Sequence, residues 1–91
     1  MKLSIVIPAY NEKESLPELF SRIQKAVTPL NCEYEIIVVD DGSTDGTFEQ
    51  LKALKKEYPM LRAIRFRRNY GKSAALAEGF DRARGEIVIT M

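Results

Sequence analysis

Short apolar runs alternate along the chain with amphipathic segments, a pattern typical of α/β proteins. Runs rich in β-branched residues at 3–7, 34–40 and 61–66 predict buried strands, and a further apolar run at 86–91 predicts a fourth strand. Between them, apolar residues recur at helical spacing at 16–27, 48–58 and 71–84. The pattern therefore predicts strands and helices in strict alternation.

Helix-breaking and capping residues mark the ends of these segments. Pro29 and Pro59 stop the first two predicted helices, and Gly85 stops the third. Ser15 and Glu18 have the spacing of a capping box at the start of the first helix.

The alternating order predicts a parallel sheet, because right-handed crossovers place the helices on its faces. We expect a three-layer α/β/α Rossmann-like fold with four parallel strands in the order 3-2-1-4 and three helices. Ligands of such sheets bind at the carboxyl ends of the strands, so the loops after residues 7, 39 and 66 are candidates. The fourth strand runs to residue 91 without a following loop, and we expect a single truncated domain spanning 1–91.

Composition and charge exclude several classes of function. A formal net charge of +1 gives no general attraction to nucleic acid or anionic membranes, so no nucleic-acid partner is expected. Without histidine, the chain has no Ser-His-Asp or Cys-His catalysis and no zinc site built on imidazole. Cys32 is the only cysteine, and the first apolar run is too short for a signal peptide. We expect a cytoplasmic location.

The first candidate loop, 8–12, follows the first strand. Pro8 turns the chain out of the sheet, Tyr10 offers an aromatic face with a hydroxyl, and Glu12 offers acceptors near a helix start. Together they suit a base or a ribose. A plain turn with a helix cap, in which Tyr10 packs over the sheet edge, is the alternative.

The second candidate loop begins with the acid pair Asp40 and Asp41. Neighbouring residues of a strand point to opposite faces, so the two carboxylates are expected to have different partners. One suits a nucleobase N–H, and the other a structural N–H or the phosphate region. Alternatively, both acids cap the following helix.

The third candidate loop is basic. Arg65, Arg67, Arg68 and Lys72 surround a helix start, where free N–H groups favour anions. The segment 71–73 resembles the end of a Walker A loop, but Phe66 stands where that loop needs glycine, so we reject that assignment. A solvated basic turn is the remaining alternative.

Three segments together resemble the opening motifs of family-2 glycosyltransferases. They are 5–12 (IVIPAYNE), 38–45 (VVDDGSTD) and 68–76 (RNYGKSAAL), in the family's order and at fitting separations. The third is most similar to the branch that uses polyprenyl or dolichol phosphates. The resemblance implies the nucleotide-sugar-binding half of a GT-A fold.

The resemblance also implies nucleotide-binding roles for seven residues. Pro8, Tyr10 and Glu12 match residues that contact the nucleotide. Val39 and Asp41 match base and ribose contacts of the polyprenyl-phosphate enzymes, and Asp40 matches the base-contacting acid of the wider family. Lys72 falls in the stretch beside the nucleotide and its diphosphate.

For a full-length parent, the resemblance implies an inverting transferase at the cytoplasmic face of the membrane. Its donor is a UDP- or GDP-linked sugar, and its acceptor is of the polyprenyl phosphate kind. The family's Asp-x-Asp motif, which binds Mg²⁺ or Mn²⁺, is expected after residue 91. We therefore assign no catalytic and no metal-binding residue, and we expect these 91 residues to be inactive alone and to bind no metal tightly.

Two alternatives to a nucleotide-binding fragment are open. One is a non-catalytic, self-associating α/β module, since the strand at 86–91 is expected to leave backbone groups at a sheet edge, where we predict a homodimer. The other is a receiver-like domain, which the position of the acid pair after the second strand disfavours.

Overall fold

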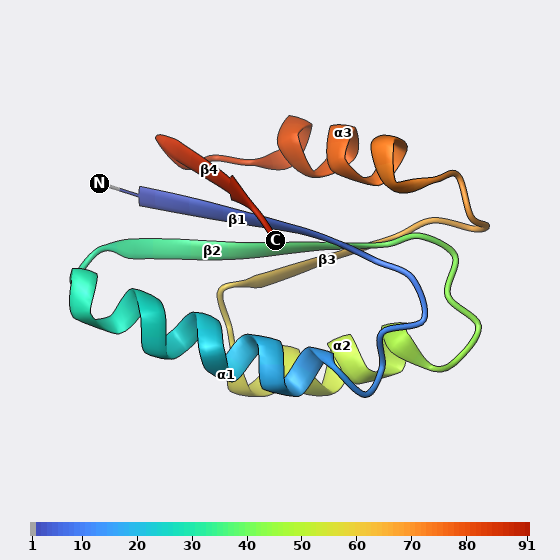
Figure 1. Cartoon of the computed structure of the whole chain (residues 1–91), viewed down its shortest axis with the longest axis horizontal. Helices are drawn as coiled ribbons and strands as arrows, with labels where there is room; N and C mark the ends of the chain where they lie inside the picture. The colour runs from blue at the N-terminus through green and yellow to red at the C-terminus, as the bar shows by residue number, and fades with distance from the viewer. Residues whose placement is uncertain (1) are drawn as a thin grey trace.

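A four-stranded parallel sheet is the middle layer of the computed structural model, which describes residues 2–91 (Figure 1). The strands, in the spatial order β3-β2-β1-β4, are β1 (Lys2–Ala9), β2 (Glu33–Asp40), β3 (Leu61–Arg65) and β4 (Ile87–Thr90). All three pairings are parallel. The predicted fold and strand order are confirmed, while Met1, the first residue of the expected 1–91 domain, lies outside the described residues.

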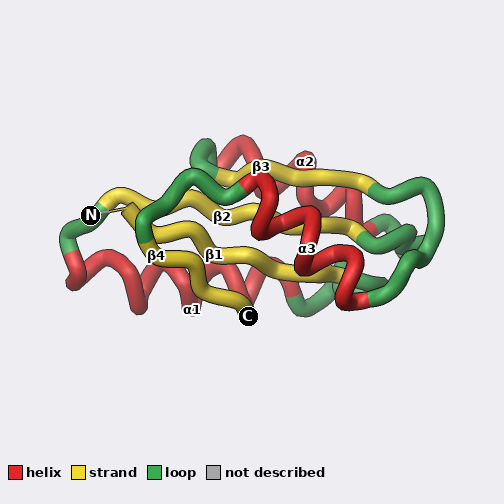
Figure 2. Tube along the Cα trace, turned by 90° about the horizontal axis from the view of Figure 1, so that it is seen from above, coloured by secondary structure: helices red, strands yellow, loops and turns green. Residues whose placement is uncertain are grey.

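Helices cover both faces of the sheet. The helices α1 (Leu16–Val27) and α2 (Thr47–Glu57) lie on one face, and α3 (Lys72–Arg82) lies on the other (Figures 1 and 2). A short 3₁₀ turn, η1 (Thr28–Leu30), follows α1. None of the helices within residues 2–91 has the length and apolar character needed to cross a bilayer.

The strand β2 is buried on both faces, as its unbroken aliphatic run predicts. Ile36 and Val38 belong to the larger core cluster under α1 and α2, whereas Ile37 and Val39 belong to a smaller cluster under α3. All four are 0% exposed. Successive side chains of a strand point to opposite faces, so this one run links both hydrophobic layers.

Small residues let α3 lie close to the sheet. Ala75 and Gly79 are buried, and a Cβ added at Gly79 would lie 2.2 Å from Cγ1 of Val6. These small residues therefore let α3 pack on β1 and β2.

The start of α1 differs from the predicted capping box. Ser15 has α-helical backbone angles and makes no capping hydrogen bond; its hydroxyl donates to the backbone oxygen and the carboxylate of Glu12. Glu18 pairs instead with Arg22, one turn later. The capping-box prediction was wrong because the preceding loop already holds Ser15 in a turn.

A buried carboxylate ties the turn before β4 to the sheet. Glu35 accepts hydrogen bonds from the Ser4 hydroxyl (2.5 Å), the Arg84 N–H (2.7 Å) and the Arg62 guanidinium (2.9 Å). Gly85 donates its N–H to the Ser4 hydroxyl in turn. Burial raises the pKa of Glu35, but these hydrogen bonds and the Arg62 charge outweigh it and lower the pKa to about 2.

The strand β4 forms one edge of the sheet and is exposed along its length. It pairs with β1 alone, from Leu3 to Val6, and Ile87, Val88 and Ile89 are each more than 40% exposed. This edge offers unpaired backbone groups and apolar side chains.

Candidate functional site

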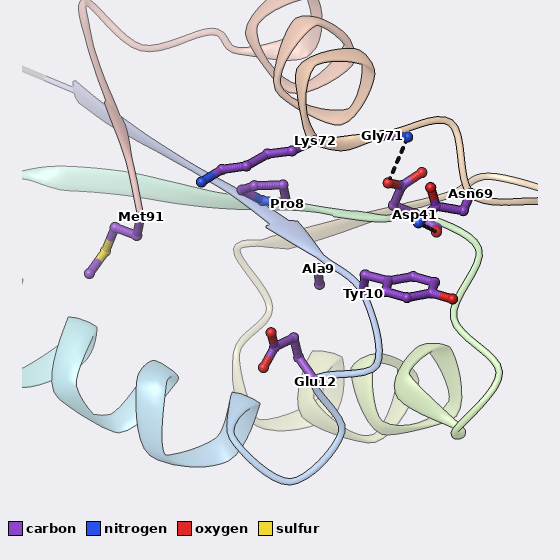
Figure 3. Close-up of a pocket in the computed structure, with 9 residues that line it drawn as sticks. All are labelled: Pro8, Ala9, Tyr10, Glu12, Asp41, Asn69, Gly71, Lys72 and Met91. Atoms are coloured by element: carbon purple, nitrogen blue, oxygen red, sulfur yellow. Dashed lines mark hydrogen bonds between the residues drawn. The ribbon is translucent and has the colours of Figure 1, made fainter.

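A pocket of about 390 Å³ lies where β1 and β2 end and α3 begins, at the carboxyl ends of the strands (Figure 3). The loops after β1, β2 and β3 border it, as expected for a ligand site of a doubly wound sheet. The lining residues are Pro8, Ala9, Tyr10, Glu12, Asp41, Asn69, Gly71, Lys72 and Met91.

The structure brings five of the seven sequence-predicted site residues together. These five are Pro8, Tyr10, Glu12, Asp41 and Lys72. Val39 and Asp40 do not line the pocket; both are 0% exposed, and Val39 packs in the core under α3. Contact of any of the seven with a nucleotide stays a prediction.

Pro8 is tolerated inside the sheet because of where β4 stops. The strand β1 continues through Pro8 to Ala9, beyond the predicted end at residue 7, and pairs with β2 there. Pairing with β4 ends at Val6, so the missing N–H of Pro8 removes no bond to β4. The proline therefore marks the place where the sheet opens into the pocket.

The two acids of the pair have different partners, as expected. One carboxylate oxygen of Asp40 accepts the N–H of Ser43 at 3.0 Å, and the other, Oδ2, is buried without a hydrogen-bond partner among residues 2–91. Buried carboxylate oxygens are normally satisfied, so Oδ2 of Asp40 is an exception among the described residues.

The carboxylate of Asp41 occupies the amino end of α3. Its two oxygens accept the N–H groups of Tyr70 (2.7 Å) and Gly71 (3.0 Å), and Gly71 is the N-cap of α3. Asp41 itself is 3% exposed. The carboxylate of Asp41 thus supplies part of the negative charge that the start of α3 favours. Neither Asp40 nor Asp41 caps α2, so the alternative in which both acids cap that helix is wrong.

The β2 and β3 loops approach so closely at Gly42 that a side chain does not fit. A Cβ at Gly42 would lie 2.3 Å from the backbone carbon of Arg68 and 2.5 Å from the nitrogen of Asn69, and φ there is +74°. Both the space and the positive φ require glycine. Together with the Asp41 bonds, this contact fixes the position of the third loop.

The β1 loop is fastened to the β2 loop by side-chain hydrogen bonds. Asn11, at a φ of 55°, accepts the Thr44 N–H at 2.9 Å, and its own N–H donates to the Ser43 hydroxyl at 2.9 Å. The Glu12 N–H donates to the Thr47 hydroxyl at 3.1 Å. These bonds hold the backbone between Tyr10 and Glu12, the part of the pocket wall that β1 supplies.

Asp45 links the loop after β1 to the start of α2 by hydrogen bonds. It accepts the N–H of Thr47 and, at 3.3 Å, the N–H of Lys13. The Thr47 hydroxyl also donates to this carboxylate, and these hydrogen bonds lower the pKa of Asp45. Asp45 therefore serves both α2 and the first loop.

The sequence-based assignment missed Asn11, Ser43, Asp45, Thr47 and Asn69. Asn11 carried a signal, because asparagine tolerates a left-handed conformation in a loop. Apart from the local bonds between Asp45 and Thr47, the others act across about 30 residues of chain, and those partners depend on the folded sheet.

The described residues do not fit a divalent metal. Within residues 2–91, no three His, Cys, Asp or Glu side chains are grouped as a metal site requires. Both oxygens of Asp41 are bonded to backbone N–H groups.

Curated relatives and solved structures resemble this chain over nearly its whole length. It is 47% identical over 91 residues to a dolichol-phosphate mannosyltransferase of Pyrococcus furiosus, covering 100% of this chain and 25% of that protein. It is 49% identical over 90 residues to an undecaprenyl-phosphate 4-deoxy-4-formamido-L-arabinose transferase of Pseudomonas fluorescens, covering 98% and 26%. The chain thus spans about a quarter of the length of these relatives.

Similarity to a solved structure extends to the arrangement of the strands. A mannosyltransferase of Pyrobaculum calidifontis, in complex with GDP-Man and Mn²⁺, superposes with a TM-score of 0.84 at 31% identity, covering 94% of this chain and 25% of that one. The family model for glycosyl transferase family 2 matches residues 4–91. With its GT-A-type sheet and its polyprenyl-phosphate relatives, the chain belongs to glycosyl transferase family 2.

Proposed function

We propose that these residues form the nucleotide-binding part of a donor site that takes a UDP- or GDP-linked sugar. The pocket at the carboxyl ends of β1 and β2 supports this, because it combines an aromatic ring, carboxylates and an ammonium group. We further propose that the site serves an inverting transfer of the sugar to a polyprenyl phosphate on the cytoplasmic side of a membrane. The names of the two curated relatives support such an acceptor.

Tyr10 and Glu12 suit the nucleoside part of the donor. The ring of Tyr10 is 48% exposed at the pocket wall, which lets a base or ribose lie against it. The exposed carboxylate of Glu12 accepts hydrogen bonds, which suits ribose hydroxyls. The hydrogen bonds of Asn11 keep both residues in place before a ligand arrives.

Lys72 suits the diphosphate. It is the first residue of α3, it is exposed, and it lines the same pocket as Tyr10. Since Asp41 already accepts the N–H groups of Tyr70 and Gly71, the Lys72 side chain offers the cationic contact that the helix start supplies only in part.

The proposed reaction needs more than these residues. Mn²⁺ is present in the complex of the P. calidifontis mannosyltransferase, and a metal of this kind would stabilise the departing diphosphate. We propose that these 91 residues alone bind nucleotide without transferring sugar. Transfer from a nucleotide sugar to a polyprenyl phosphate by this chain alone would contradict that part of the proposal.

A nucleotide titration tests the binding proposal. We would add UDP, GDP and uridine to isotope-labelled protein, with and without Mg²⁺, and follow the backbone amide signals. Saturable shifts are expected at residues 10–12, 39–43 and 69–73, with no Mg²⁺ dependence. Whichever of UDP and GDP binds with the higher affinity identifies the base.

Matched lysine variants separate a phosphate contact from a general charge effect. Lys72→Gln is expected to weaken UDP or GDP binding about tenfold and to leave uridine binding unchanged, since one charge-assisted contact is lost. Lys56→Gln, on the exposed side of α2, removes the same charge away from the pocket and is expected to change neither. Absence of shifts at millimolar nucleotide would refute the proposed site.

A further inference from the structure

Three arginines on the β3–α3 segment form no ion pair with a carboxylate among the described residues. Arg65, Arg67 and Arg68 are all exposed, and no ion pair within residues 2–91 involves them. Arg65 lies over the ring of Phe48 at 4.9 Å, and Arg68 lies over that of Tyr70 at 5.1 Å. The positive charge of this segment is therefore not neutralised by nearby acids, although the whole chain has a net charge of only +1.

This segment is held firmly in place. Asp41 binds the backbone at Tyr70 and Gly71, and Gly42 packs directly against the backbone of Arg68. Arg67 and Arg68 are thus displayed on a loop that the residues after β2 hold in place, and Arg65 is the last residue of β3. A fixed loop loses less conformational entropy when its side chains bind a charged surface.

The basic segment lies at the same end of the molecule as the candidate pocket. The loops after β1, β2 and β3 meet at one end of the long axis (Figure 1), and Asn69, which directly follows the arginines, lines the pocket. Within the same segment, Tyr70 is 54% exposed. Exposed tyrosine beside basic residues suits the interface between lipid headgroups and water.

We propose that Arg65, Arg67, Arg68 and Tyr70 form a docking surface for an anionic lipid bilayer. The inference rests on the proposed function, in which the acceptor is a lipid-linked phosphate and the pocket works at a membrane surface. Docking through this loop brings the pocket end of the sheet toward the headgroups, where the phosphate of such an acceptor lies. Charge complementarity with anionic headgroups supplies the attraction.

A bilayer fits this surface better than a nucleic acid does. Arg65 is the last residue of β3, and Arg67 and Arg68 follow it directly, so the three lie within residues 65–68 and not along a strip that follows a phosphate backbone. Two of the three are already stacked on aromatic rings of the chain itself, which leaves those ring faces covered.

Vesicle co-sedimentation tests the docking surface. Vesicles of phosphatidylcholine alone are compared with vesicles containing phosphatidylglycerol at about a third of the lipid, at low and at high salt. Binding is expected only to the anionic vesicles and is expected to weaken with salt. Arg67→Gln/Arg68→Gln is expected to lower the partition coefficient about fivefold for each arginine removed.

The control variant Lys25→Gln/Lys56→Gln removes two charges from the last turns of α1 and α2 and is expected to bind vesicles like the wild type. An equal loss of vesicle binding in the arginine and the lysine double variants would overturn the proposal. Absence of wild-type binding to anionic vesicles would overturn it as well. Binding to single-stranded nucleic acid without vesicle binding would also overturn it. Amide spectra of each variant check the fold.

Nucleotide titration of the same variants separates this inference from the proposed function. Neither Arg67 nor Arg68 lines the pocket, so nucleotide binding is expected to stay unchanged in the double variant. Nucleotide binding without vesicle binding overturns the docking surface alone. Vesicle binding without nucleotide binding overturns the proposed donor site.

Discussion

The substitution Glu35→Gln keeps the shape of a buried side chain and removes the charge that three hydrogen-bond donors share. These donors are the Ser4 hydroxyl, the Arg84 N–H and the Arg62 guanidinium. Glutamine keeps one acceptor oxygen and turns a nitrogen donor toward the remaining partners. The substitution therefore leaves at least one of the donors without its acceptor, in a place where Glu35 is only 5% exposed.

The magnitude follows from the pKa of Glu35, which is lowered from its ordinary 4.5 to about 2. A difference of this size between the folded and unfolded states corresponds to about 3 kcal/mol of folding free energy. The contribution is fully present above pH 4.5, where the unfolded carboxyl is also ionised. It is lost as the pH falls from 4.5 to about 2, because the unfolded chain takes up the proton first.

Urea unfolding from neutral pH down to about pH 3 measures this contribution. The wild type is expected to lose free energy of unfolding on acidification below pH 4.5, whereas Glu35→Gln starts about 2–3 kcal/mol lower at neutral pH and has a flatter profile in that range. Glu33→Gln, exposed on the same strand, is the matched control and is expected to leave the profile unchanged. If Glu35→Gln and the wild type lose stability in parallel below pH 4.5, the assignment of the acid-sensitive group is wrong.

Three further predictions concern packing, the pocket and the free edge. Gly79→Ala is expected to destabilise the fold by about 1–3 kcal/mol, because its methyl group would meet Val6 at 2.2 Å, and thermal unfolding would show this. Asp41→Asn is expected to loosen the amino end of α3, raising amide exchange at Gly71 and weakening nucleotide binding several-fold; unchanged exchange would show that the carboxylate is dispensable there. A homodimer through β4 is expected at high micromolar concentration, with Ile89→Lys expected to keep the chain monomeric, and a monomeric wild-type mass by light scattering would contradict it.

Features that depend on neighbouring residues were predictable from the sequence. The four aliphatic residues from Ile36 to Val39 predict a strand buried on both faces, and alternation with amphipathic helices predicts a parallel sheet. The ends of elements differ from the predicted ones. The helix α3 stops at Arg82, before the predicted residue 84, because the backbone N–H of Arg84 donates a hydrogen bond to Glu35. The loops of the site were placed correctly because the ends of parallel strands share one edge.

Features that depend on distant partners were not predictable in the same way. The sequence places Asp41 beside Asp40, but nothing local indicates that its carboxylate accepts the N–H of Gly71. Likewise, the spacing of Ser15 and Glu18 favours a capping box only when no other partner is near, and Glu12 provides one. Side-chain hydrogen bonds between loops are decided by the folded sheet, which the spacing of residues does not describe.

The position of β1 has a consequence for how the chain folds during synthesis. The strand β1 is made before the other three strands, yet it lies between β2 and β4, and its pairing with β4 joins Val6 to Thr90. Contacts across so many residues close slowly, because a long loop must be ordered before they form. Until β4 emerges, β1, which is buried in the finished sheet, lies at an open edge, and an open edge of this kind is a surface that chaperones protect.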